Sequence, residues 1–129
     1  MELLTFFLER HPAKAVFSTS LGAEDQVILH MLWTIGKPLK VFTLDTGRLF
    51  QETYDLLSIT RNKYKIPIDI YFPDAGAVES MVNERGINLF YDSVENRQHC
   101  CHIRKIVPAK RAMQGMEVWI TGIRRDQLM

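Results

Sequence analysis

Cysteine is scarce in this sequence: the 129 residues contain two, and they are adjacent, at Cys100 and Cys101. Adjacent cysteines are a poor basis for the disulfide framework of a small secreted protein, so their interest is as thiols. An excess of charge of one sign is also lacking, because sixteen Lys and Arg stand against fifteen Asp and Glu. A net charge of +1 gives no overall field for holding nucleic acid or an anionic membrane. Any anion selectivity must come from local clusters.

Long hydrophobic runs are missing too. The N-terminal segment MELLTFFLERHPAK contains an apolar stretch much shorter than the roughly 20 residues that cross a bilayer. It also lacks the basic start and the small-residue cleavage site of a secretory signal, which favours a cytoplasmic protein. The composition, 47% hydrophobic and 24% charged, is ordinary for a globular chain. We expect one folded domain over residues 1–129, since this length is enough for one core.

Short β-prone runs alternate with longer amphipathic segments along the chain. The runs expected to be strands are 15–18, 40–44, 66–72 and 117–121. The segments expected to be helices are 23–35, 49–62, 75–85, 96–107 and 108–113, with Gly86 ending the third and Pro108 in the first turn of the last. This alternation predicts an α/β fold, an open and mostly parallel sheet with helices on both faces.

The turns that follow the strands are the candidate site, because ligands of open parallel sheets bind beyond the carboxyl ends of the strands. The first turn offers the hydroxyl groups of Ser18 and Ser20, the flexible Gly22 and the N–H groups of a helix start, which suit phosphate or sulfate oxygens. The glycine spacing and the lysine of a Walker loop are missing. An ordinary N-capping turn explains the same residues equally well.

Two further turns carry polar groups. The second, from Leu44 to Arg48, could place a carboxylate and a backbone amide against a ribose or an adenine edge, although Asp45 or Thr46 could also cap the next helix. The third follows the last strand and contains Arg124 and Arg125, whose guanidinium groups can bind a phosphate or sulfate in bidentate fashion. By themselves, two surface arginines are more often solvated charge.

The segment HCCHIRK at residues 99–105 is the most unusual in the chain. Consecutive side chains of a helix point about 100° apart, so its four ligand-type residues cannot surround one zinc ion. Two adjacent thiolates can hold one side of a larger iron–sulfur cluster if other cysteines complete it. One helical turn further on, we expect Arg104 near Cys100 and Lys105 near Cys101, because residues i and i+4 share a face, and these cations would stabilise thiolates or an anionic substrate. Two buried cysteines that pack as small apolar residues are the simpler alternative.

Four segments resemble, in order and spacing, the assimilatory adenylyl-sulfate (APS) reductases of the PAPS/APS reductase family: FSTSLGAEDQ at 17–26, LDTGRLFQETY at 44–54, CCHIRKIVPAKRA at 100–112 and WITGIRRDQ at 119–127. The resemblance implies an adenine nucleotide α-hydrolase-like, Rossmann-like fold whose first motif is a modified pyrophosphate loop. It also implies a nucleotide–sulfate site at or near residues of all four segments. These residues are Ser18, Ser20, Gly22, Leu44, Asp45, Thr46, Gly47, Lys105, Gly122, Arg124 and Arg125.

The resemblance implies a two-stage reaction. In this family a cysteine thiolate attacks the sulfur of APS and expels AMP, and thioredoxin or a related dithiol then releases sulfite. Members with a Cys-Cys pair carry a [4Fe-4S] cluster and reduce APS, whereas typical phosphoadenylyl-sulfate (PAPS) reductases lack both, which makes Cys100 and Cys101 cluster ligands and APS the substrate. The family's other cluster cysteines and its nucleophile lie beyond the position of Met129. We therefore expect no catalytic residue, no complete cluster and no activity in the isolated chain.

Other interpretations stay open beside APS reduction. A PAPS reductase differs in its substrate, and a catalytically dead nucleotide-binding module fits a domain that is incomplete at its C-terminus. An ATP-pyrophosphatase-like adenylating enzyme would need an SGGxDS-type loop, from which residues 18–24 depart. The expected ligands are APS and AMP, and the expected partner is thioredoxin or a similar dithiol. Neither nucleic acid nor a membrane is an expected partner, and a homo-oligomer is left open.

Overall fold

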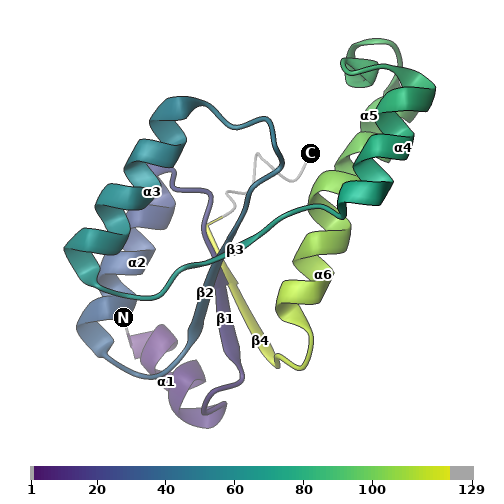
Figure 1. Ribbon diagram of the computed structural model, residues 1–129. Helices are drawn as coiled ribbons and strands as arrows, with labels where there is room; N and C mark the ends of the chain where they lie inside the picture. The colour runs from purple at the N-terminus through teal and green to yellow at the C-terminus, as the bar shows by residue number, and fades with distance from the viewer. Residues whose placement is uncertain (1, 123–129) are drawn as a thin grey trace. The chain divides into compact units, whose positions relative to one another are not determined.

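The computed structural model describes residues 2–122 (Figure 1). Helices and strands alternate through most of this range. In chain order they are α1 (Glu2–Arg10), β1 (Ala15–Ser18), α2 (Ala23–Ile35), β2 (Lys40–Leu44), α3 (Gln51–Tyr64), β3 (Asp69–Tyr71), α4 (Ala75–Arg85), the 3₁₀ turn η1 (Leu89–Tyr91), α5 (Val94–Cys101), the π-helical turn η2 (His102–Ile106), α6 (Val107–Met113) and β4 (Val118–Thr121).

The strands form one four-stranded sheet in the order β3-β2-β1-β4. β1 pairs in parallel with β2 on one side and with β4 on the other, so that Val16 lies opposite Lys40 and opposite Trp119. Helices separate the strands along the chain, as parallel pairing requires. The expected α/β class with a parallel sheet is confirmed. No helix among residues 2–122 is long and apolar enough to span a bilayer.

The chain divides into two compact units, which are described separately. The first comprises residues 1–43, 50–69 and 115–129, and the second comprises residues 44–49 and 70–114. The first unit holds β1, β4, most of β2 and helices α1 to α3, whereas α4 to α6 belong to the second. That the whole chain is one folding domain stays a prediction.

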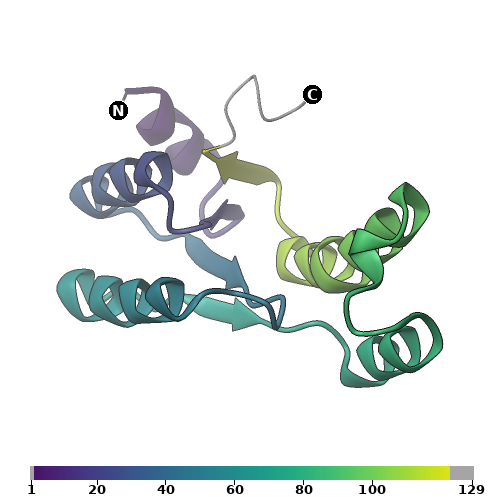
Figure 2. The ribbon, with the colours of Figure 1, turned by 90° about the horizontal axis from the view of Figure 1, so that it is seen from above.

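β1 forms the centre of the core of the first unit. Ala15, Val16 and Phe17 are fully buried, as expected for a strand with neighbours on both sides. Leu29 and Leu32 are the buried residues on the apolar side of α2. α2 lies beside α3 in both views (Figures 1 and 2), and the Gln26 side chain of α2 donates a hydrogen bond to Thr60 Oγ1 of α3 at 3.0 Å. This hydrogen bond joins α2 to α3 within the first unit.

The second unit is built around a helical run and a small apolar core. α5, η2 and α6 follow one another without a break, and Figures 1 and 2 show them as one rod. Met81 and Leu89 form a buried cluster with Cys100, and the partly buried Phe90 and Ile103 pack against it. The first cysteine of the pair, Cys100, is therefore packed in this core.

Most predicted boundaries agree with the structure to within a few residues. The predicted helix 23–35 has the observed bounds of α2, because Gly36 takes a left-handed φ of 74° that ends it. α3 begins at Gln51 rather than at 49, after Phe50 as its N-cap. β3 is shorter than the predicted 66–72, since Pro67 cannot donate to a strand ladder. α1 and η1 were not predicted.

The helix predicted over 96–107 differs in its winding. α5 begins at Val94, where the Ser93 hydroxyl accepts the Asn96 N–H at 3.0 Å. After Cys101 the chain makes a π turn with i→i+5 bonding before α6 begins. The inference that placed Arg104 next to Cys100 assumed uniform α-helical spacing, and that spacing does not hold across the π turn.

Candidate functional site

The candidate turns leave the sheet at one edge. Ser18 ends β1, Leu44 ends β2 and Thr121 ends β4. Because β1 is parallel to both neighbours, these three carboxyl ends point the same way. In open parallel sheets this edge is where ligands bind. The turns therefore stand where the sequence predicted them, and the roles of their residues stay predictions.

The first turn has a constrained backbone. Its Thr19 N–H donates to Phe42 O at 2.9 Å, and the Thr43 hydroxyl donates to Thr19 O at 2.8 Å, which ties the turn to β2. The Leu21 N–H donates to Thr19 Oγ1 at 3.0 Å. Leu21 is buried with a φ of 66°, a left-handed conformation that costs a non-glycine residue on the order of 1 kcal/mol. The turn thus holds one strained shape through its own hydrogen bonds.

A buried carboxylate organises the same turn. Asp25, in the first turn of α2, is 7% exposed, and its Oδ2 accepts the Ser20 N–H at 2.6 Å and the Ser20 hydroxyl at 2.7 Å. α2 is N-capped by Gly22 without a side-chain hydrogen bond, so the interpretation of Ser18 or Ser20 as the cap is wrong. In this arrangement Ser20 gives both of its hydrogens to Asp25 and shapes the turn. Sequence reasoning missed Asp25, because acidic residues are common in first turns of helices.

Gly122 lies against that carboxylate. A Cβ atom built on Gly122 would stand 1.9 Å from Asp25 Oδ1 and 3.1 Å from its Cγ. The backbone after β4 therefore approaches Asp25 more closely than any side-chain-bearing residue allows. The resemblance implied a place for Gly122 in the site, and the structure supplies a steric reason for glycine there.

Ser18 has a different partner. The Trp119 indole N–H donates to Ser18 Oγ at 2.8 Å, although the Trp119 side chain itself is half-exposed. A hydroxyl that accepts a hydrogen bond still has its own proton to donate. Ser18 can thus offer that proton to an anion, whereas Ser20 cannot without leaving Asp25.

The start of α2 adds backbone donors to the first turn. The first hydrogen bond within the helix joins the Gln26 N–H to Gly22 O at 3.0 Å. At the start of any helix the backbone N–H groups point outward along the axis, and the helix dipole places partial positive charge there. Such an end attracts phosphate or sulfate oxygens.

The second turn belongs to the second unit and is held by its own side chains. Asp45 Oδ1 accepts the Gly47 N–H at 2.8 Å, and Thr46 Oγ1 accepts the Arg48 N–H at 3.2 Å. Gly47 has a φ of 83°, which only glycine adopts at little cost. α3 is capped at Phe50, so the alternative that Asp45 or Thr46 caps it is wrong. The two polar side chains build a tight turn instead.

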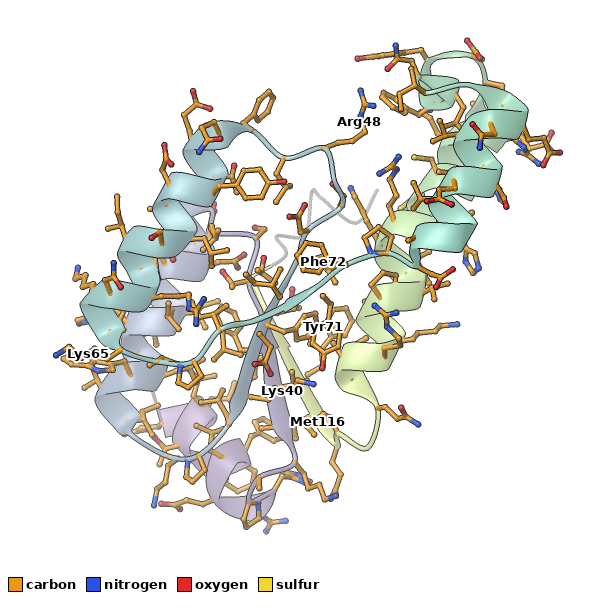
Figure 3. All side chains as sticks on the ribbon, viewed as in Figure 1. Lys40, Arg48, Lys65, Tyr71, Phe72 and Met116 are labelled. Atoms are coloured by element: carbon orange, nitrogen blue, oxygen red, sulfur yellow. The ribbon has the colours of Figure 1, made fainter. Side chains whose placement is uncertain are left out.

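Arg48 fastens this turn to η1. Its guanidinium donates to Ile87 O at 3.2 Å and to Asn88 Oδ1 at 3.1 Å, and its Cζ lies 4.6 Å from the centre of the Phe90 ring. Figure 3 shows the Arg48 side chain extended away from its turn toward the upper end of α4 and α5. Its charge is used within the unit, as a cation–π and hydrogen-bonding anchor.

Arg104 reaches the turn from the π-helical segment. It is 7% exposed, and its Nη1 donates a hydrogen bond to Thr46 O. A Cβ atom built on Gly47 would lie 3.1 Å from the same nitrogen. Sequence reasoning placed this cation beside a thiol, and only the tertiary structure reveals its contact with the turn.

The two cysteines have different environments. Cys100 is buried in the cluster with Met81 and Leu89, as the apolar-packing alternative supposed, whereas Cys101 is half-buried. A [4Fe-4S] cluster takes four thiolates, and this chain has two cysteines, so its residues do not complete such a site. Among residues 2–122 no group of three or more His, Cys, Asp or Glu side chains could hold a metal ion.

The predicted site residues fall into both units. The first unit contains the first turn with Ser18, Ser20 and Gly22, and also Gly122. Ser20 and Gly122 lie against the Asp25 carboxylate. The second unit contains the turn from Leu44 to Gly47 together with Lys105, Cys100 and Cys101, and Lys105 is exposed. Arg124 and Arg125 lie outside the described residues.

Comparison with known proteins gives consistent matches. A family model described as the phosphoadenosine phosphosulfate reductase domain matches residues 14–128. Adenosine 5'-phosphosulfate reductase from Agrobacterium fabrum is 46% identical over 114 residues, which are 88% of this chain and 44% of that protein. The enzyme of the same name from Burkholderia cepacia is 43% identical over 125 residues, 97% of this chain and 50% of that protein.

A solved structure shares the fold. The crystal structure of phosphoadenylyl-sulfate (PAPS) reductase from Candida auris, a phosphate complex, superimposes with a TM-score of 0.80 at 27% identity. The match covers 99% of this chain and 62% of that one. The chain spans about half the length of the curated relatives it matches.

Proposed function

Because the chain belongs to the phosphoadenosine phosphosulfate reductase domain family, we propose that it is the nucleotide-binding part of an adenylyl-sulfate reductase. The proposed overall reaction converts APS and a dithiol to sulfite, AMP and a disulfide, so that the dithiol supplies the two electrons that reduce the sulfur. Relatives at 43–48% identity that bear this name support the assignment.

The proposed nucleotide–sulfate contacts are residues of the turns after the strands, together with three cations. The Ser18 hydroxyl and the N–H groups at Gly22 and the start of α2 would bind oxyanion oxygens, with Ser20 holding the turn in shape through Asp25. The turn from Leu44 to Gly47 would bind the nucleoside. Lys105, Arg124 and Arg125 would offset the negative charge of sulfate and of the departing AMP, and Gly122 would allow the close approach of the chain.

One observation carries the proposal most strongly: both turns are held in a fixed conformation by hydrogen bonds of their own. Asp25 fixes one through Ser20, and Asp45 and Thr46 fix the other. A turn that is already ordered loses little conformational entropy when it binds, so it favours a small ligand. The strained backbone of Leu21 and the buried carboxylate of Asp25 distinguish the first turn from an ordinary solvated surface loop.

APS is the proposed substrate and PAPS the alternative. The adjacent cysteines favour APS, since the resemblance links that pair to the branch that carries a [4Fe-4S] cluster. A thioredoxin-type dithiol is the proposed electron donor. The alternative that the chain is a catalytically dead nucleotide-binding fragment differs from this proposal in turnover and agrees with it in nucleotide binding.

We expect the chain to bind AMP weakly and APS more tightly, because APS adds a sulfate that backbone N–H groups and Lys105 can bind. Lys105→Ala should weaken APS binding about tenfold, or ~1.4 kcal/mol, and should change AMP binding much less. Isothermal titration calorimetry with APS, PAPS and AMP measures these affinities directly.

Lys110→Ala is the matched control for this titration. Lys110 is another exposed lysine on the same helical run, so its loss should leave both affinities unchanged. No binding of any of the three nucleotides at millimolar concentration by a folded sample would contradict the proposed function. Tighter binding of PAPS than of APS would favour the alternative that the chain is part of a PAPS reductase.

The proposed cluster ligation predicts that the chain alone takes up no stable [4Fe-4S] cluster. Cys100 and Cys101 supply two of about four thiolates that such a cluster normally needs. Anaerobic reconstitution followed by iron and sulfide analysis should give no cluster for this chain. A version extended by a segment with Cys-x-x-Cys should take up about four irons.

Two outcomes of the reconstitution would change the assignment. A full cluster on each 129-residue monomer would refute the view that this cysteine pair is half of a site. One cluster per two chains would indicate ligands shared between protomers.

A further inference from the structure

Arg104 is the buried cation of the second unit. Its side chain is 7% exposed, and burial of a guanidinium group is costly unless its hydrogens find acceptors. The contact that the structure gives it is the Thr46 carbonyl, reached by Nη1, whereas its buried Nε has no hydrogen-bond partner. We therefore expect the buried guanidinium to stabilise the turn that contains Thr46, through its hydrogen bond to the Thr46 carbonyl.

We propose that Arg104 is a positioning residue for the turn from Asp45 to Gly47, which it holds through the Thr46 carbonyl. It thereby sets nucleotide affinity without touching the nucleotide. This inference rests on the proposed function, in which the turn binds the nucleoside.

The fit between Arg104 and the turn is close. A Cβ atom on Gly47 would lie 3.1 Å from Nη1, so an added methyl group would press against the guanidinium. Gly47 also has the left-handed φ of 83° that allows the turn to close under this group. Glycine at this position therefore serves both the backbone conformation and the approach of the arginine.

The turn is held at three points within its unit. Arg48 fastens its far end to Ile87 O and Asn88 Oδ1 at 3.2 and 3.1 Å. The Asp45 N–H donates to Tyr71 O at 2.9 Å at its near end. Arg104 donates a hydrogen bond to the middle of the turn, at Thr46 O. Its side chain is buried. Removing it should loosen the middle while both ends stay attached.

The π turn gives this contact its place in the helical run. η2 spans His102–Ile106 and contains Arg104, directly after the cysteine pair. A π turn inserts an extra residue into the winding and so changes the direction of the side chains it carries relative to a uniform α-helix. The helical run that contains Cys100 and Cys101 therefore also contains Arg104, whose guanidinium contacts the turn.

The first test measures backbone protection of the turn in the full chain without nucleotide. In Arg104→Ala, the amide hydrogens of Gly47 and Arg48 should exchange at least about tenfold faster than in the wild type, because local opening becomes easier. Arg104→Lys keeps a positive charge with N–H donors at its end and should retain part of the protection. Arg97→Ala, an exposed arginine of α5, should leave it unchanged.

The second test measures AMP affinity of the same variants by calorimetry. Arg104→Ala should weaken binding about tenfold, Arg104→Lys less, and Arg97→Ala not at all. If Arg104→Ala fails to fold, Arg104→Lys decides: unchanged exchange at the turn and unchanged affinity in that folded variant overturn the proposal. If the wild type binds no AMP, the proposed function fails, and wild-type exchange rates in folded Arg104→Ala would separately overturn the positioning role.

Discussion

Gly122→Ala is expected to lower the free energy of unfolding by about 2–3 kcal/mol, because the new methyl group would force the Asp25 carboxylate out of its place. Its Cβ would stand 1.9 Å from Oδ1, so the carboxylate must move. Movement of Asp25 breaks its hydrogen bonds from Ser20 at 2.6 and 2.7 Å, and bonds to a charged group are stronger than average. Urea unfolding followed by circular dichroism measures the loss.

A double-mutant cycle with Asp25 shows whether this is the cause. Asp25→Ala removes the obstacle along with its hydrogen bonds, so adding Gly122→Ala to it should cost less than about 0.5 kcal/mol more. The two substitutions are therefore expected to be strongly non-additive. If their effects simply add, Gly122 is required for a reason other than its approach to Asp25.

The surroundings of Asp25 show how a carboxylate can belong to the turn that we propose binds an anion. Its charge accepts two hydrogens from Ser20 and lies in the first turn of α2, where the helix dipole stabilises negative charge. These contacts would reduce its repulsion of a sulfate bound as proposed. In return it holds the turn, so that Ser18 and the helix N–H groups are presented in a fixed arrangement.

The alternation of strands and helices could be predicted because local signals coincided with the tertiary structure. Residues 15–18 are β-prone and become the buried central strand, and Gly36 ends α2 where its hydrophobic pattern stops. The places of the candidate turns also followed from the parallel sheet, since these turns come directly after the carboxyl ends of its strands. Periodicity and turn chemistry suffice for this level of the structure.

The roles of individual polar residues could not be predicted in the same way. Asp25 looks like an ordinary helix-start acid, and its closeness to Gly122 joins residues far apart in the chain. Arg104 looked like a cation beside a thiol, because α-helical spacing gives no sign of a π turn. Burial and tertiary contacts decide both cases, and a local pattern carries neither.

Phe17→Ala should have the largest effect on stability, with a loss of about 3–5 kcal/mol in the free energy of unfolding. Phe17 is 0% exposed, so removal of its ring leaves a cavity in the core. Because β1 is paired with a strand on each side, the strand cannot shift to fill this cavity. Such a loss is a large part of the roughly 5–15 kcal/mol that stabilises a typical domain. Thermal and urea unfolding should both show it.

The same substitution should weaken AMP binding, because Ser18 follows Phe17 directly and the first turn takes its direction from the end of β1. Phe17→Leu, which keeps most of the buried volume, should cost less than about 1.5 kcal/mol and retain binding. Phe50→Ala is the matched control: this phenylalanine of the same unit is 79% exposed, and its loss should change stability by no more than about 0.5 kcal/mol. A Phe17→Ala protein as stable as Phe50→Ala would show that β1 is not the centre of this core. A folded Phe17→Ala protein with wild-type affinity for AMP would show that the first turn does not depend on the packing of β1.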